Sequence, residues 1–155
     1  MSKSIQIGEV APNIIAKIQN ADGTLTDFDL YQVLDSGQKV LIVFYPGDDT
    51  PGCTAQLCAI RDIYSDYENA GITVVGINPA SDESHLKFIA KYNYQFGIIV
   101  DDTKSIRENY GAVGSFFGKP TTRRSVFLIN TDKVVAYRFF GQQDNAKVLE
   151  IASGL

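Results

Sequence analysis

Two apolar runs lie along the chain, one continuous at positions 40–45 and one with a single threonine at positions 72–77. Such runs are typical of strands that are buried on both faces of a sheet, since a strand with one exposed face alternates apolar and polar residues. Between the runs, apolar side chains recur at spacings of three and four, at Leu57, Ile60, Tyr64 and Tyr67. This spacing predicts an amphipathic helix, so the chain contains a strand, helix and strand unit with an expected right-handed crossover.

Further elements are predicted on both sides of this unit. The pattern predicts two β-hairpins, formed by residues 14–18 with 24–28 and by residues 125–130 with 133–140. It also predicts a strand at 97–100 and helices at 30–34, 84–92, 103–110 and 144–152. The glycine-containing stretch 111–118 is expected to be a flexible loop. Together these elements predict an α/β fold, with helices on the faces of a mixed sheet.

Composition sets the scale of this fold. The 155 residues are 45% hydrophobic and 21% charged and contain no internal repeat, which predicts a single domain over residues 1–155. A chain of this length buries enough surface to fold without a metal ion or a disulfide. The net charge of -4 and the lack of a block of Lys and Arg argue against a nucleic-acid partner.

The expected compartment bears on the two cysteines. Residues 1–13 lack the basic and apolar stretches of a secretory signal, and the run at 40–45 is too short to cross a bilayer. We therefore expect a cytoplasmic protein with no membrane partner. In that compartment Cys53 and Cys58 are expected to be catalytic, redox-active or metal-binding rather than a structural disulfide.

Cys53 lies where open α/β sheets hold their ligands, beyond the carboxyl end of the run at 40–45. Pro51 ends the intervening turn, so Cys53 falls in the first turn of the following helix. Unpaired backbone N–H groups and the positive end of the helix dipole favour an anion there. The sequence therefore predicts a stabilised Cys53 thiolate.

The residues around Cys53 resemble a known family. The spacing Pro46-x-x-x-Thr50-x-x-Cys53 resembles the peroxiredoxin active-site motif. The stretch from Thr50 to Cys58 is similar to the branch called peroxiredoxin Q or bacterioferritin comigratory protein, and the likeness extends to Arg61-Asp62 and to Arg124-Ser125-Val126-Phe127. It implies a thioredoxin-like fold, a mixed sheet flanked by helices with an N-terminal β-hairpin.

The resemblance also implies a set of roles. Cys53 is then the peroxidatic cysteine and Cys58 the resolving cysteine, with Pro46, Thr50 and Arg124 in the pocket. The implied activity is that of an atypical 2-Cys thiol peroxidase without cofactor or metal, which reduces hydrogen peroxide and has organic hydroperoxides as further candidate substrates. The implied reductant is thioredoxin or a glutaredoxin-like protein, and the implied assembly is a monomer or a weak homodimer.

Each implied role has a physical reason. Negative charge develops on the departing peroxide oxygen, so the site needs donors, which the Thr50 hydroxyl and the Cys53 N–H can supply. Arg124 offers a permanent charge and a planar set of N–H groups, while Pro46 shields the pocket from water. Adjacent strand residues face opposite sides, so we expect Arg124 rather than Arg123 in the pocket, from its distance to Phe127. Gln56, where the family often has Glu, is not expected to touch this chemistry.

Alternative functions are weighed against the same residues. A structural zinc site wants four ligands, whereas the chain has two cysteines and one histidine, His85, which is expected on a helix surface. A disulfide-exchange protein or thiol-dependent chaperone would carry C-x-x-C, whereas four residues separate Cys53 from Cys58. A non-catalytic interaction domain stays a further alternative, because a fold alone does not fix a function.

The spacing of the two cysteines predicts a conformational change. Residues five apart on a helix have Cα atoms roughly 8–9 Å apart. A disulfide tolerates at most about 7 Å between Cα atoms. If Cys53 and Cys58 pair, the first turn of the helix must therefore unwind.

Overall fold

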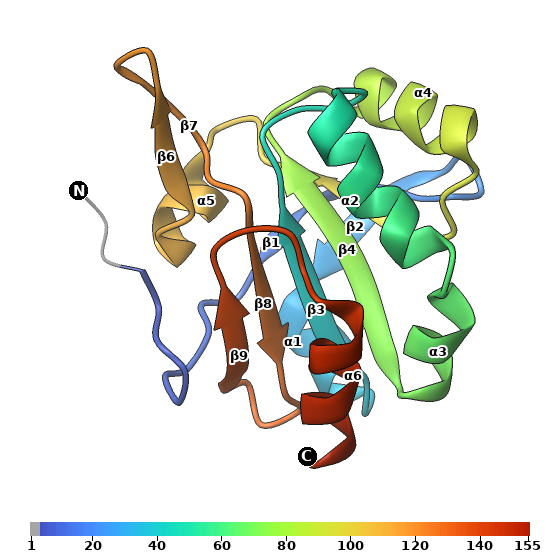
Figure 1. Cartoon of the computed structure of the whole chain (residues 1–155), viewed down its shortest axis with the longest axis vertical. Helices are drawn as coiled ribbons and strands as arrows, with labels where there is room; N and C mark the ends of the chain where they lie inside the picture. The colour runs from blue at the N-terminus through green and yellow to red at the C-terminus, as the bar shows by residue number, and fades with distance from the viewer. Residues whose placement is uncertain (1–3) are drawn as a thin grey trace.

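A seven-stranded mixed sheet forms the centre of the protein (Figure 1), in a computed structural model that describes residues 4–155. The sheet has the order β2-β1-β5-β4-β3-β8-β9, and β6 pairs with β7 apart from it. The strands are β1 (Ile15–Gln19), β2 (Leu25–Asp29), β3 (Lys39–Phe44), β4 (Ile72–Asn78), β5 (Gly97–Val100), β6 (Val113–Phe116), β7 (Lys119–Thr122), β8 (Ser125–Ile129) and β9 (Val135–Phe139). Because β3 pairs with β4 in parallel and with β8 antiparallel, it lies inside the sheet.

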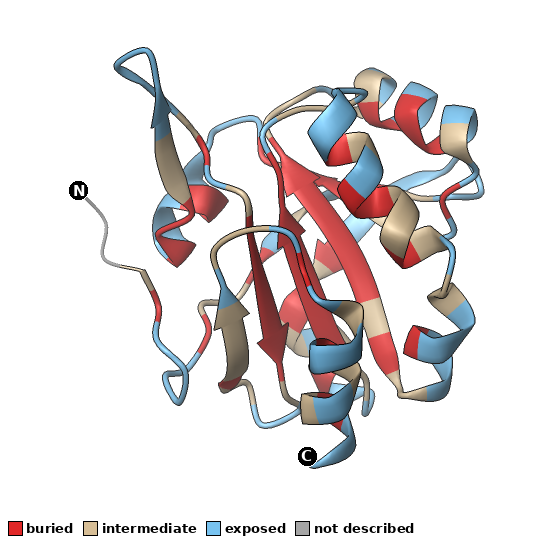
Figure 2. Ribbon diagram, viewed as in Figure 1, coloured by how far each residue is buried: buried red, intermediate tan, exposed pale blue. Residues whose placement is uncertain are grey.

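Helices cover both faces of the sheet. They are α1 (Leu30–Asp35), α2 (Pro51–Arg61), α3 (Tyr64–Asn69), α4 (Asp82–Tyr92), α5 (Ser105–Tyr110) and α6 (Asn145–Ser153). One apolar cluster joins the sheet to α2, α3, α4 and α6, and a second joins it to α1 and α5. In β3, Leu41 and Val43 belong to the first cluster, whereas Val40 and Ile42 belong to the second. The strand is therefore buried on both faces, as its apolar run predicts, and Figure 2 shows it almost wholly in red.

The predicted α/β class, with a thioredoxin-like mixed sheet and an N-terminal hairpin, is confirmed. β1 and β2 pair antiparallel, and β8 and β9 form the second predicted hairpin. The helix predicted through Leu57, Ile60, Tyr64 and Tyr67 is instead two helices, because the chain leaves helical geometry at Ile63 (φ -125°, ψ 27°). The break redirects the chain so that both Ile60 and Tyr67 are fully buried.

The prediction of a flexible loop at residues 111–118 was wrong. Residues 113–122 form the antiparallel hairpin of β6 and β7, which projects from the sheet in Figure 1. Its turn is made by Phe117 and Gly118, both with positive φ (51° and 77°). A two-residue turn of this kind matches the twist of paired strands, and the phenylalanine at its first position conceals the usual sequence signal.

Residues 1–13 are expected to lack a secretory signal. The first three of them lie outside the described residues. Among the helices of residues 4–155, none is both long enough and apolar enough to span a bilayer.

Candidate active site

Cys53 lies in the first turn of α2, at the carboxyl end of β3. Thr50 is the N-cap of the helix and Pro51 its first residue, so Cys53 is the third helical residue. The Thr50 side chain gives the helix no capping hydrogen bond, Pro51 has no N–H, and Thr54 N–H already donates to Thr50 O. The N–H groups of Gly52 and Cys53 are thus the first-turn donors left for a ligand. The Cys53 side chain is buried, with 1% of the residue exposed.

Arg124 contacts the Cys53 sulfur from the connection between β7 and β8. Its Nη2 donates to Cys53 Sγ at 3.3 Å, and its Nη1 donates to Gln56 Oε1 at 2.5 Å. Arg123 turns the other way and is exposed, with its guanidinium 3.7 Å from the centre of the Phe140 ring. The structure therefore brings Arg124, and not Arg123, to the Cys53 sulfur.

Gly52 makes room for this arginine. A Cβ atom at position 52 would lie 3.2 Å from Arg124 Nη2, closer than ordinary van der Waals contact. Glycine inside a helix costs stability relative to alanine, so its presence here marks a close approach. Sequence reasoning missed Gly52, although a glycine between Pro51 and Cys53 was the available signal.

Gln56 was not expected to touch the chemistry, but the structure places it against Arg124. Its side chain is fully buried and accepts the hydrogen bond from Arg124. Gln143 supports it from the segment before α6, because Gln143 Nε2 donates to Gln56 O at 3.0 Å. Gln56 is a neutral partner, so it does not cancel the positive charge of Arg124. That charge faces the Cys53 sulfur.

Pro46 and Thr50 lie in the loop that leads to Cys53. Both residues are exposed in the loop between β3 and α2. The Thr50 hydroxyl donates to Gly47 O at 3.3 Å, which closes the loop on itself. In this arrangement the hydroxyl is beside the first turn of α2, and its predicted donation to a peroxide stays a prediction.

Cys58 lies about one and a half turns further along α2 and faces a different neighbour. Its sulfur is 3.5 Å from the hydroxyl oxygen of Tyr94. Cys53 and Cys58 are both free thiols on one unbroken helix, as the reduced state requires. Helical geometry places their Cα atoms roughly 8–9 Å apart, beyond the reach of a disulfide.

A buried carboxylate fixes the loop that precedes the site. Asp48 Oδ2 accepts from His85 Nδ1 at 2.6 Å and from Ser84 Oγ at 2.7 Å. Asp48 Oδ1 accepts from Tyr45 Oη at 2.7 Å and from Asn78 Nδ2 at 2.8 Å. Burial raises the pKa of Asp48, but the hydrogen bonds and the charge of His85 outweigh it, so the pKa lies below its ordinary value.

His85 is therefore not on a helix surface, and that expectation was wrong. The residue is fully buried in α4, with Nε2 3.2 Å from Ile99 O. Its helical neighbours Phe88 and Ile89 are also buried, at spacings of three and four from it. This spacing was the signal that the histidine shares the apolar face of the helix.

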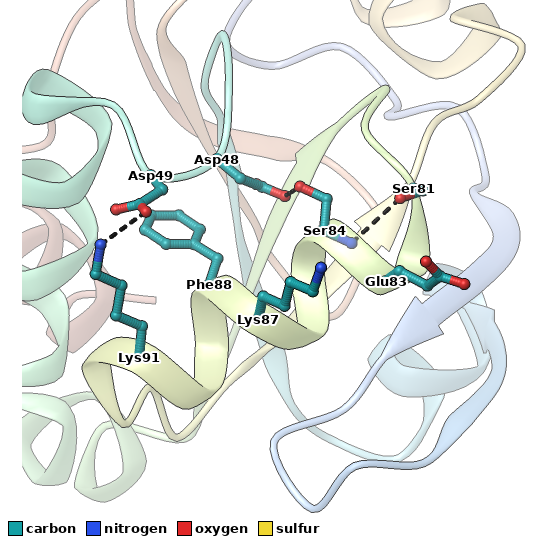
Figure 3. A pocket seen from close by; sticks show the side chains of 8 residues that line it. All are labelled: Asp48, Asp49, Ser81, Glu83, Ser84, Lys87, Phe88 and Lys91. Atoms are coloured by element: carbon teal, nitrogen blue, oxygen red, sulfur yellow. Dashed lines mark hydrogen bonds and ion pairs between the residues drawn. The ribbon is translucent and has the colours of Figure 1, made fainter.

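A hollow of about 350 Å³ lies between the β3–α2 loop and α4. Figure 3 shows that Asp48 bonded to Ser84 and Asp49 bonded to Lys91 are among the residues that line this hollow. The residues that line it include neither cysteine, so it is not the site of the sulfur chemistry. Within residues 4–155, no group of three or more His, Cys, Asp or Glu side chains is placed to hold a metal ion.

The chain is similar in sequence to proteins of a known family. The AhpC/TSA family model matches residues 7–138. A Coxiella burnetii protein named as a peroxiredoxin bcp is 36% identical over 137 residues, covering 86% of this chain and 87% of that protein. The chloroplastic peroxiredoxin Q of Triticum aestivum is 35% identical over 135 residues, which cover 87% of this chain and 59% of the wheat protein.

Solved structures show the same fold at lower identity. The peroxidoxin BcpB of Mycobacterium tuberculosis superimposes with a TM-score of 0.83 at 22% identity, covering 97% of this chain and 98% of that one. A cysteine-to-serine mutant of PrxQ from Xylella fastidiosa gives 0.82 at 20% identity, covering 99% and 96%. The family match and the bacterial relative together decide membership: the chain belongs to the AhpC/TSA family, in the branch of the bcp and Q peroxiredoxins.

Proposed function

We propose that the chain is a thiol-dependent peroxidase in which Cys53 is the sulfur that peroxide oxidises. The observation that carries the proposal is the contact between Arg124 Nη2 and Cys53 Sγ at the start of α2. A fixed guanidinium and two free backbone N–H groups stabilise a thiolate and the negative charge that develops on a departing oxygen. Family membership supports the same chemistry.

The first step transfers one peroxide oxygen to sulfur. The Cys53 thiolate attacks that oxygen, an S–O bond forms and the O–O bond breaks. The departing oxygen takes up a proton and leaves as water or an alcohol, and Cys53 becomes a sulfenic acid. Arg124 holds the two reactants together, Thr50 donates to the peroxide, and Pro46 limits access of water.

The second step forms a disulfide within the chain. The Cys58 thiolate attacks the Cys53 sulfenic sulfur, an S–S bond forms, the S–O bond breaks, and water leaves. Since Cys53 and Cys58 are too far apart on the intact helix, the first turn of α2 unwinds before this step. The enzyme is then an atypical 2-Cys peroxiredoxin, which needs no cofactor.

We also propose substrates, a reductant and an assembly for this peroxidase. The substrates are hydrogen peroxide and organic hydroperoxides, and the reductant is thioredoxin or a glutaredoxin-like dithiol protein that restores both thiols by exchange. We propose that residues 1–155 act as one cytoplasmic domain, as a monomer or weak homodimer. The absence of a C-x-x-C pair and the tasks available to Thr50 and Arg124 favour this function over disulfide exchange alone.

The test is a steady-state assay with hydrogen peroxide and several hydroperoxides, each with thioredoxin and with glutaredoxin as reductant. Cys53→Ser should abolish turnover, since the serine hydroxyl stays protonated at neutral pH. Cys58→Ser should leave the first oxidation intact and let the Cys53 sulfenic acid accumulate, visible by trapping and mass spectrometry. Peroxidase activity that survives Cys53→Ser would refute the proposal.

A further inference from the structure

Tyr94 places a hydroxyl group beside the second cysteine. It follows α4 directly, after Asn93 turns the chain through a left-handed conformation (φ 58°). Its Oη is 3.5 Å from Cys58 Sγ. Tyrosine is larger and more polar than most core residues, and a buried tyrosine hydroxyl usually has a hydrogen-bond partner. Here that partner is a sulfur that takes part in the proposed reaction.

The Tyr94 ring is held in place by other aromatic rings. Its centre is 5.1 Å from that of Phe88, edge to face, and 5.2 Å from that of Phe96, stacked. Tyr92 stacks at 5.8 Å. The residue is 3% exposed. Because its neighbours fix the ring, the hydroxyl already points at Cys58 before the reaction. No side-chain entropy of Tyr94 has to be lost during the reaction.

The Tyr94 hydroxyl keeps its proton. Burial and, to a smaller extent, the hydrogen bond with Cys58 raise its pKa well above the ordinary value. A phenol that stays protonated is available as a hydrogen-bond donor at every pH at which a thiol ionises. A donor of this kind stabilises a thiolate more than a thiol, since hydrogen bonds to charged groups are the stronger ones.

The half of α2 that carries Cys58 is attached to the segment that carries Tyr94. Arg61 Nη1 donates to Tyr92 O at 3.0 Å, and Gln95 Nε2 donates to Arg61 O at 3.1 Å. The half that carries Cys53 has its own contact with Arg124 instead. When the first turn of α2 unwinds, these bonds hold Cys58 beside Tyr94 while Cys53 moves.

We propose that Tyr94 is a catalytic residue for disulfide formation, whose hydroxyl donates a hydrogen bond to the Cys58 sulfur and stabilises it as the attacking thiolate. The inference rests on the proposed peroxidase function and deepens it. The Cys58 proton leaves to solvent, the thiolate attacks the Cys53 sulfenic sulfur, and the hydroxide that departs takes up a proton and becomes water. Tyr94 itself is neither oxidised nor deprotonated.

The test compares Tyr94→Phe with the unaltered chain by rapid mixing with hydrogen peroxide, followed by thiol trapping and mass spectrometry at each time point. The rate of Cys53 oxidation should be unchanged. The rate of disulfide formation should fall about tenfold at pH 7, the loss of one hydrogen bond to a charged sulfur. The loss should shrink at high pH, where thiols ionise without a donor. The charge of Arg61, which also acts on Cys58, is the same in both proteins.

Tyr64→Phe is the matched control. Tyr64 belongs to the same aromatic group, stacked on Phe96 at 6.1 Å, and it is not a partner of Cys58. In the Tyr64→Phe variant, the Cys53–Cys58 disulfide should form at the same rate as in the unaltered chain. An unchanged rate in Tyr94→Phe, an equal loss in Tyr64→Phe, or a loss that is the same at every pH would overturn the role of Tyr94. If the unaltered chain forms no Cys53 sulfenic acid, the peroxidase function itself fails.

Discussion

Asp48 and His85 form a buried pair that fastens the loop before the active site to helix α4. Their side chains are 2.6 Å apart, from Oδ2 to Nδ1, and are 5% and 0% exposed. Neither side chain contacts Cys53, so the pair takes no direct part in the sulfur chemistry. Its effect is on position, because the loop carries Pro46 and Thr50 and leads into the first turn of α2.

Asp48→Asn should destabilise the protein by about 2 kcal/mol or more at pH 7, because it breaks a buried, hydrogen-bonded pair. The folded-state pKa of Asp48 lies below its ordinary value, so the stabilisation is present above the unfolded-state pKa of about 3.9 and is lost as pH falls through the folded pKa. The gap between variant and unaltered protein should therefore narrow below about pH 4. Urea unfolding across this pH range measures both effects.

Asp49→Asn is the control for this prediction. Asp49 is the next residue and is exposed, with bonds to Lys91 and Tyr92 at the protein surface. Ion pairs at the surface contribute little to stability, so the variant should unfold almost like the unaltered protein. Equal destabilisation by the two substitutions would show that burial of the Asp48 pair has no special effect.

Arg124→Ala should lower the second-order rate constant for Cys53 oxidation by about 10²–10³-fold, the effect of removing one donor from a developing oxyanion. Arg123→Ala should change this rate constant little, since Arg123 stacks on Phe140 and leaves Cys53 untouched. Stopped-flow mixing with hydrogen peroxide measures both. The reverse order of effects would show that the guanidinium on Cys53 is not the one that matters.

Gly52→Ala should separate stability from reactivity. Alanine at this helical position should raise the free energy of unfolding by about 0.5 kcal/mol, because it lowers the entropy of the unfolded chain. Its Cβ would meet Arg124 Nη2 at 3.2 Å, so the guanidinium must shift. Peroxide should then oxidise Cys53 several-fold more slowly. A more stable variant with unchanged reactivity would mean that the position of Arg124 tolerates this shift.

Oxidation should loosen α2 as far as Cys58 while the sheet stays protected. In the disulfide form, amide hydrogen exchange should rise in residues 50–58, because their helical turn has unwound. Residues 40–45, in and just after β3, should keep their protection, since they are fully buried and β3 lies between β4 and β8. Exchange measured by mass spectrometry on both redox forms tests this. Equal protection of residues 50–58 in the two forms would contradict local unwinding.

Much of the fold could be predicted because apolar periodicity reports burial directly. The strands β3 and β4 and the helix α4 were predicted from the sequence, and the structure contains all three. The hairpin of β6 and β7 could not be found in this way, because its strands are short and largely exposed. Exposed strands bury too little apolar surface to leave a period in the sequence.

In the site, residues close together in the sequence could be predicted, whereas contacts between distant residues could not. Cys53, Thr50 and Cys58 lie within one short segment, so their spacing alone places them on α2. The contacts of Arg124 with Gln56 and of Cys58 with Tyr94 join residues 68 and 36 positions apart. No local pattern predicts such pairs, because tertiary packing decides which side chains meet.

Asp48 and Asp49 both attach the loop to α4, and β3 before them is buried on both faces. The loop should therefore stay in place if the first turn of α2 opens, and the ladders of the sheet should lose no hydrogen bond. The free energy of opening the first turn of α2 and the free energy of unfolding the protein therefore depend largely on different residues. A change in the first turn of α2 should therefore alter the rate of cycling between the redox forms more than it alters the free energy of unfolding.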